Sequence, residues 1–294
     1  MTDKELLDEL KSRFDKNKKD FDELQRLNNE LIKLNKKLED SEALKSHFIS
    51  NIANEIVNPF TSILALSKNI LTVKKEDWKT VISMVALIHS EAFNLDFQLK
   101  NIFMAAQIEA GNLAPEICHA DIKVLVEKVI DSFKVEANKK HIKTKFSTKI
   151  ESNDNNLRFK TDPEKFMLIL ANLVNNAIQF SDKEQEIEIT IDKLASNLKM
   201  AVIDQGKGID EESQKLIFDR FKRINNDINT LNRGHGLGLS VTKSLIDLLQ
   251  GKIEIFSKKN VGTNITVVLP EIDSESLGFD FDGDEYLFGD NEAF

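Results

Sequence analysis

The sequence contains one cysteine, Cys118, and no long apolar run. A single cysteine excludes a disulfide framework within the chain and a cysteine-rich metal site. No apolar stretch reaches the ~18 residues that a membrane span needs. The first ten residues, MTDKELLDEL, lack the apolar core of a signal peptide. We therefore expect a cytoplasmic protein without a membrane span.

The charged residues are distributed unevenly along the chain. From Glu271 to the end there are nine acidic residues and no basic one, whereas the preceding 270 residues carry 40 charges of each sign. The resulting net charge of −9 argues against a nucleic-acid binder. With 41% hydrophobic and 30% charged residues among 294, the composition is that of a globular protein with about two domains.

The first 43 residues are rich in charge and in regularly spaced leucines. The leucines alternate in steps of three and four, at Leu24, Leu27, Leu31, Leu34 and Leu38. Lys, Glu and Asp lie between them, which is the pattern of a coiled-coil seam. We predict a coiled-coil helix over residues 1–43 that favours a parallel dimer. The alternative is an amphipathic helix that packs on its own domain.

Two further apolar stripes with helical spacing lie between residues 44 and 112. The first comprises Ile49, Ile52, Ile56, Pro59, Ile63, Leu66 and Ile70. After a polar turn at about residues 72–76, the second comprises Trp78, Val81, Val85, Ile88, Ala92, Leu95, Leu99, Ile102 and Ala106. Two antiparallel helices cannot bury both stripes alone, but two copies form a four-helix bundle. The pattern predicts a helical hairpin over residues 44–112 that dimerises, with Gly111 ending the second helix.

Residues 113–270 mix helical and strand patterns. We predict helices over residues 121–137, 163–180 and 239–249. Strands are predicted over about residues 142–150, 186–194, 198–203, 252–257 and 264–269. This order favours an α+β two-layer sandwich over strict βαβ repetition.

Two glycine signatures lie within this region. Asp204-Gln-Gly206-Lys-Gly208 follows a predicted strand, and Gly234-His-Gly236-Leu237-Gly238-Leu239 opens a predicted helix. Glycines let the backbone approach a ligand closely, and a helix N-terminus suits phosphate. A purine nucleotide needs an acidic side chain for its amino group and bare backbone for its phosphates. Together with Asn172 and Asn176 upstream, the signatures predict a nucleotide site.

A polar strip follows the outer face of the first hairpin helix, at His47, Asn51, Asn54 and Asn58. The stretch HFISNIANEIVNPF that contains it resembles the phosphoacceptor box of sensor histidine kinases. Four residues match that box: Phe48, Glu55, Asn58 and Pro59. Asn54 stands where the family has its phosphorylated histidine.

Residues from about 113 to 270 resemble the ATP-binding domain of the same family, the GHKL fold that gyrase, Hsp90 and MutL also use. Residues 172–181 are similar to its N box, which implies that Asn176 ligates Mg²⁺, with Asn172 beside it. Gln179 stands where the family usually has Lys or Arg. The resemblance implies that Asp204 accepts the adenine amino group. It also implies that ATP is bound by Gly206, Gly208, Gly234, Gly236, Leu237, Gly238, Leu239 and Thr263.

Asn54 determines the functional hypothesis. An imidazole nitrogen has a free lone pair that attacks the γ-phosphate, whereas the lone pair of an amide nitrogen is delocalised into its carbonyl. Glu55, which accepts the histidine's proton in the family, then has nothing to deprotonate. We therefore expect a pseudo-histidine kinase of two-component signalling that is dimeric and binds Mg-ATP.

The same resemblance implies the partners. The dimer forms with a second copy or with an intact histidine kinase, and the target is a response regulator receiver domain or that partner kinase. Asn58 occupies a position implicated in phosphatase activity, so a phosphatase acting on the regulator is one hypothesis.

Two alternative functions stay open. One is an active kinase that uses His47, seven residues upstream on the same face and about 10 Å away by helical rise. The other is a non-catalytic interaction scaffold, which Gln179 favours and the intact glycine signatures disfavour. The acidic-aromatic tail over residues 271–294 is either a solubilising segment or a docking peptide with aromatic anchors.

Overall fold

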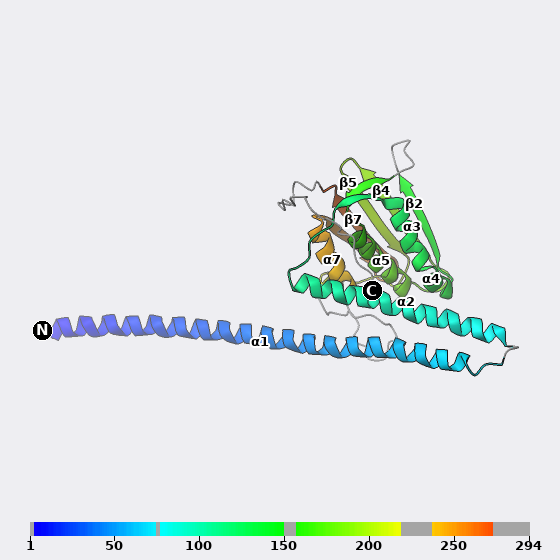
Figure 1. Cartoon of the computed structure of the whole chain (residues 1–294). Coiled ribbons are helices and arrows are strands. Elements are labelled where there is room, and N and C mark those ends of the chain that lie inside the picture. The colour runs from blue at the N-terminus through cyan, green and yellow to red at the C-terminus, as the bar shows by residue number, and fades with distance from the viewer. Residues whose placement is uncertain (1–2, 75–76, 150–156, 219–236, 273–294) are drawn as a thin grey trace, which may run out of the picture. The chain divides into compact units, whose positions relative to one another are not determined.

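The computed structural model describes residues 3–74, 77–149, 157–218 and 237–272 (Figure 1). On the first helix, the side chains of residues 3–12, 14, 15, 22 and 37–55 are also outside this description. The predictions for Gly234, Gly236 and the tail from residue 273 onward lie outside the described residues. The chain divides into two compact units, Met1–Asn58 and Pro59–Phe294, and each is described by itself.

The first unit consists of a single helical element. Helix α1 runs over Asp3–Ile70, so the two stripes predicted before residue 71 lie on one helix. Four seam leucines, Leu24, Leu27, Leu31 and Leu34, are 46–65% exposed. The helix is confirmed, whereas the coiled-coil dimer stays a prediction. None of the described helices is long and apolar enough to cross a membrane.

Helix α2, over Trp78–Glu109, is the second arm of the predicted hairpin. The Asp77 carboxylate caps its first turn by accepting hydrogen bonds from the backbone and hydroxyl of Thr80. The helix ends just before Gly111, whose φ of 69° is in the left-handed region that a helix C-terminus favours. The predicted hairpin helices are therefore present.

The rest of the second unit is a two-layer sandwich. Its five-stranded sheet has the order β2-β4-β5-β7-β6. These strands are β2 (Lys143–Lys149), β4 (Glu186–Leu194), β5 (Asn197–Asp204), β6 (Lys252–Lys258) and β7 (Gly262–Pro270). The sheet is mixed, because β2 and β4 are parallel and the other neighbours are antiparallel. A separate antiparallel pair joins β1 (Cys118–Asp121) to β3 (Arg158–Thr161).

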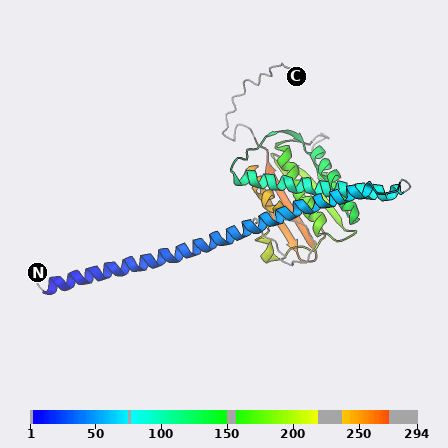
Figure 2. The same cartoon turned by 60° about the horizontal axis from the view of Figure 1, so that its bottom comes forward.

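Helices cover one face of the large sheet (Figures 1 and 2). They are α3 (Ile122–Ser132), α4 (Lys134–Lys139), α5 (Pro163–Phe180) and α7 (Gly238–Leu248), and a short α6 (Glu211–Gln214) follows β5. Helix α5 is the centre of the core, since ten of its residues are buried. The sandwich predicted from the sequence is thus confirmed.

The structure corrects one helix. Residues 121–137 were predicted as continuous, but α3 and α4 are separated at Phe133, which leaves helical geometry at φ −94° and ψ 1°. The Phe133 ring is buried and packs edge-on against Phe93 and Phe97 of α2. Strands β1 and β3 and helix α6 were not predicted, because four-residue elements are too short to show a period.

One face of α2 packs on the sandwich. We call it the docking strip, and its residues recur in steps of three and four: Ser90, Phe93, Phe97, Asn101, Met104 and Ile108. At one end, Ser90 donates a hydrogen bond to Glu136 at 2.6 Å and accepts one from Lys139, both on α4. In the middle, the centroids of Phe93 and Phe97 lie 5.1 and 5.5 Å from that of Phe133. The docking strip therefore joins α2 to the sandwich through polar and aromatic contacts.

Candidate nucleotide site

Helix α5 carries the three N-box residues and is fixed firmly at its start. The Asp162 carboxylate caps the helix by accepting from the Lys165 backbone at 3.0 Å, and it pairs with the buried Lys165 ammonium at 2.5 Å. It also accepts from the Glu116 backbone at 2.7 Å, which ties the segment after α2 to the helix. Pro163 in the first turn suits a helix start because its missing N–H is not needed there.

The three N-box side chains have different environments. Asn172 is only 2% exposed, and its Nδ2 donates to Oδ1 of Asn101 at 2.8 Å. Asn176 and Gln179 lie one and two turns further along α5 and are half-buried. An amide oxygen on Asn176 is the ligand type that Mg²⁺ accepts, so this side chain is accessible for the predicted role.

Asp204 is the last residue of β5 and lies opposite Thr263 on β7. Its Oδ1 accepts a hydrogen bond from the Gly206 backbone at 2.8 Å. Burial raises the pKa of Asp204, although hydrogen bonds from the Gly206 and Thr263 backbones act in the opposite direction. The Thr263 hydroxyl lies 2.9 Å from Oγ of Ser257. The structure thus brings together the two residues that the sequence assigned to the adenine side.

The loop after Asp204 is held by backbone contacts on both sides. Lys207 donates its N–H to the Phe180 carbonyl at the end of α5 and accepts from the Asn260 backbone at 2.6 Å. A Cβ on Gly206 would lie 2.4 Å from the Phe180 carbonyl oxygen. Gly208 has a φ of 62°, and a Cβ there would lie 2.0 Å from the Lys258 carbonyl oxygen. Both glycines are therefore required by close packing of backbone on backbone.

Lys140 belongs to none of the sequence motifs. Its ammonium donates to the carbonyls of Ile178 and Gln179 at 2.7 Å and of Ser181 at 3.0 Å, at the end of α5. Burial lowers the pKa of Lys140, with the charges of Asp182 and Lys207 acting in opposite directions. A cation at a helix C-terminus stabilises its free carbonyls. Lys140 lies 38 residues from Ile178, so no local pattern links them.

The second glycine signature is described only from Leu237 onward. Leu237 is buried, Gly238 begins α7, and Leu239 follows in its first turn. Two hydroxyl oxygens, Ser181 Oγ at the end of α5 and Thr242 Oγ1 on α7, are buried without a hydrogen-bond partner in the described structure. A carboxylate, a glycine-containing loop and a helix N-terminus together fit a purine nucleotide. Asn176 supplies an oxygen donor suited to Mg²⁺.

The phosphoacceptor-like residues lie on α1 and are far in sequence from Asp204 and Thr263. Asn54, Glu55 and His47 belong to this helix, but their side chains fall outside the described part of the structure. Asn58 is exposed, and the following Pro59 is buried. The exposure of Asn58 is what a role towards a docking partner requires.

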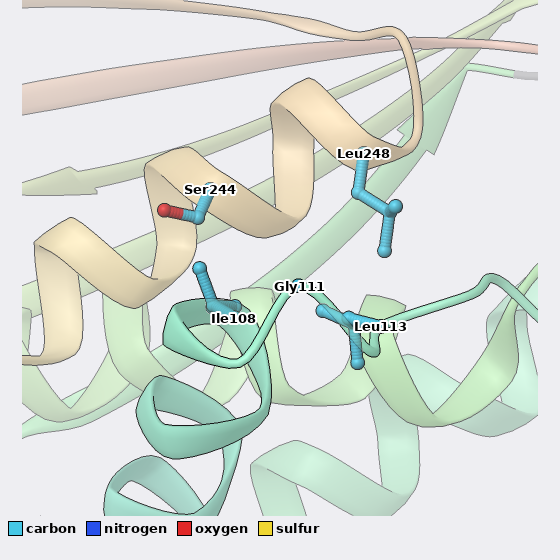
Figure 3. Close-up of a pocket in the computed structure, with 5 residues that line it drawn as sticks. All are labelled: Ile108, Gly111, Leu113, Ser244 and Leu248. Carbon is cyan, nitrogen blue, oxygen red and sulfur yellow. The ribbon is translucent and has the colours of Figure 1, made fainter.

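A separate small cavity of about 250 Å³ lies where α2 ends beside α7 (Figure 3). It is lined by Ile108, Gly111, Leu113, Ser244 and Leu248. None of the predicted nucleotide ligands lines it. The residues around it are mainly apolar and come from the end of α2, the segment after it and α7. The cavity is therefore part of the packing interface between α2 and the sandwich.

Comparisons with known proteins show a similarity to histidine kinases and to the ATPase domain that they contain. Residues 161–273 match a family model described as "Histidine kinase-, DNA gyrase B-, and HSP90-like ATPase". The chain is 28% identical over 231 residues to the sensor-like histidine kinase SenX3 of Mycobacterium tuberculosis, covering 79% of this chain and 55% of that protein. It is 30% identical over 233 residues to the circadian input-output histidine kinase CikA of Synechocystis, covering 78% of this chain and 31% of that protein.

A solved structure shares the fold. The Acinetobacter baumannii histidine kinase AdeS aligns with a TM-score of 0.51 and 20% identity, covering 75% of this chain and 98% of that one. The chain spans about half the length of the SenX3 relatives that it matches.

Proposed function

From a histidine kinase core with a GHKL ATP-binding domain, we propose that this protein binds Mg-ATP and acts in two-component signalling as a pseudo-histidine kinase. One observation carries the proposal: nucleotide-site residues that match the family pattern, except at Gln179, are combined with Asn54 at the phosphoacceptor position. The described site residues support the first half, and amide chemistry supports the second.

In this proposal Asp204 accepts the adenine amino group, and Thr263 lies beside it on the neighbouring strand. Gly206 and Gly208 let the backbone of this loop pack against the carbonyls of Phe180 and Lys258, and the N-terminus of α7 at Gly238 faces phosphate charge. Asn176 holds Mg²⁺ through its amide oxygen, with Asn172 beside it. Bound Mg²⁺ supplies charge neutralisation at the phosphates.

Asn54 prevents phosphoryl transfer to the usual position. Its amide nitrogen is a very poor nucleophile, and Glu55 has no imidazole proton to accept. The output is then a nucleotide-dependent conformation of a dimer. The dimer is formed with a second copy or with an intact histidine kinase, and it controls a response regulator receiver domain or that partner kinase.

The deciding experiment incubates the purified protein with γ-labelled ATP and Mg²⁺ and measures acid-labile phosphoprotein. We expect no label on the wild type and a gain of label on Asn54→His, because Glu55 and the nucleotide site remain. Asp204→Ala in the Asn54→His background is the control, and it should abolish that gain. Label on the wild type that disappears in His47→Ala would overturn the proposal and establish His47 as the acceptor.

A further inference from the structure

The side-chain amide of Asn172 lies between two segments that are far apart in the sequence, α2 and the start of α7. Its Nδ2 donates to Oδ1 of Asn101 on α2, at 2.8 Å. Its Oδ1 faces the start of α7, because a Cβ added at Gly238 would lie 3.2 Å from that oxygen. One carboxamide thus contacts the docking strip on one side and the second glycine signature on the other.

This pair of asparagines is buried and geometrically constrained. Asn101 is 6% exposed and Asn172 is 2% exposed, so neither exchanges its partner for bulk water without moving the helix. Asn101 is itself oriented, because its Nδ2 donates to the Phe97 carbonyl one turn earlier at 3.1 Å. Its Oδ1 is therefore directed at Asn172. Leaving a buried amide without its partner costs free energy, so this orientation is maintained while α2 stays docked.

We propose that Asn101 is a positioning residue for nucleotide binding, because it sets the orientation of the Asn172 carboxamide. Through this contact, the docked position of α2 is coupled to the ATP site. The proposal rests on the proposed nucleotide function. When α2 shifts, Asn172 loses its acceptor and its carboxamide is free to turn beside Gly238 and the neighbouring Asn176. By thermodynamic linkage, a nucleotide that binds better to one orientation of Asn172 also changes how often α2 is docked on the sandwich.

The docking strip provides a matched control within the same interface. Ser90 is buried on α2 like Asn101 and hydrogen-bonds across to Glu136, but that contact lies on α4 and involves no residue of the nucleotide signatures. Ser90→Ala removes a contact at the other end of the docking strip and leaves the hydrogen bond between Asn101 and Asn172 in place. If docking alone mattered, Ser90→Ala and Asn101→Ala would have the same effect on nucleotide affinity.

The test is a double-mutant cycle in the full chain, with Mg-ADP affinity measured by calorimetry. Asn101→Ala should weaken binding about fivefold, the value expected for one oriented hydrogen bond. It should have little further effect when Asn172→Ala is already present, and Ser90→Ala should leave the affinity near that of the wild type. An equal loss from Asn101→Ala in both backgrounds, or an equal loss from Ser90→Ala, would overturn the inference.

A measurement on the wild type does not depend on how the variants fold. Saturating Mg-ADP should shift the side-chain amide resonances of Asn101 in a nitrogen–proton correlation spectrum, with Asn94 elsewhere on α2 as the internal reference. If the Gly206 backbone signal responds and the Asn101 amide does not, nucleotide binding stands and the coupling is wrong. If neither responds at saturating ligand, the proposed nucleotide function itself fails.

Discussion

At the residue scale, the environment of Asp204 disfavours the ionised carboxylate, which is the form that would bind an adenine amino group. Burial raises the pKa of this group, whereas the Gly206 and Thr263 backbones offer it hydrogen bonds. A raised pKa means that folding disfavours the ionised form. The negative charge is nevertheless what an adenine amino group would use. Burial of Asp204 therefore costs folding stability when the carboxylate is ionised.

The first prediction follows from this conflict and concerns Asp204→Asn. The variant should be more stable than the wild type in the absence of ligand and should bind nucleotide at least about tenfold more weakly, since it loses a charged hydrogen-bond acceptor. The pH dependence has a definite sign. In the wild type the contribution of Asp204 to stability is fully present below its ordinary pKa and is lost as pH rises through the raised value.

Urea unfolding at a series of pH values checks this prediction. The stability advantage of Asp204→Asn should therefore appear as pH rises through the raised pKa and persist to neutral pH. Glu188→Gln, on the exposed side of the neighbouring strand β4, serves as a control for a general charge effect. An advantage that is equal at all pH values would show that burial of the charge is not the cause.

A second residue-scale prediction concerns the buried ion pair at the start of α5. Asp162→Ala removes the helix cap, the partner of the Lys165 ammonium and the acceptor for the Glu116 backbone. It leaves a buried charge uncompensated, which costs about 3–5 kcal/mol of unfolding free energy. Chemical denaturation measures the loss.

The matched control for this pair is the double variant Asp162→Asn with Lys165→Met. It keeps an oxygen to cap α5 and removes both charges, so most of the lost stability should return. A double variant as unstable as Asp162→Ala would mean that the lost Glu116 contact, rather than the unpaired ammonium, dominates.

The site residues differ in how far the sequence alone could identify them. Asp204 and Thr263 belong to short motifs with their own spacing, and the structure places them opposite each other on β5 and β7. Lys140 and Asn101 act through partners 38 and 71 residues away. Only the tertiary fold creates those contacts, so no local pattern could have revealed them.

At the scale of elements, α2 carries the predicted apolar stripe on one face and the docking strip on another. Its sequence shows the apolar stripe more clearly than the docking strip. The predicted stripe from Trp78 to Ala106 is uninterrupted and apolar, whereas the docking strip contains the polar residues Ser90 and Asn101. Because polar residues break a hydrophobic pattern, the docking strip was missed. The structure explains both residues, since each makes a buried hydrogen bond across to the sandwich. The long helices and strands, in contrast, were predictable from periodicity.

The exposed seam of α1 supports an element-scale prediction about assembly. Leu27 and Leu34 are 46% and 56% exposed, although they occupy positions that a coiled coil would bury. The double variant Leu27→Lys with Leu34→Lys should weaken a dimer at least about tenfold, because each change places a charge in the seam. Sedimentation equilibrium measures the effect.

The control for this prediction adds the same charge away from the seam. Gln25→Lys with Asn29→Lys changes exposed positions on the other side of α1 and should leave the association unchanged. If both double variants associate as the wild type does, the leucines of α1 do not form the dimer. If the wild type is a monomer at all accessible concentrations, the coiled-coil prediction is wrong.

At the scale of the whole molecule, the proposed pseudo-histidine kinase would retain a reaction that needs no phosphorylated histidine. Hydrolysis of an aspartyl phosphate on a regulator needs a water whose oxygen forms a bond to phosphorus while the bond to the aspartyl oxygen breaks. The products are inorganic phosphate and the free aspartate. No histidine takes part in this balance, and positioning of the water is most of what the protein must supply.

The last prediction is that Asn58 supplies this positioning. It is exposed on α1, one turn after Asn54, and a carboxamide can both donate to and accept from a water molecule. Addition of the wild type should speed the loss of phosphate from a receiver domain labelled with a small phosphodonor. Asn58→Ala should remove most of that acceleration, whereas Asn69→Ala, an exposed asparagine further along the same helix, should retain it. A receiver domain that binds the protein and yet loses phosphate at its intrinsic rate would exclude this reaction, and the bundle would then act on its partners by binding alone.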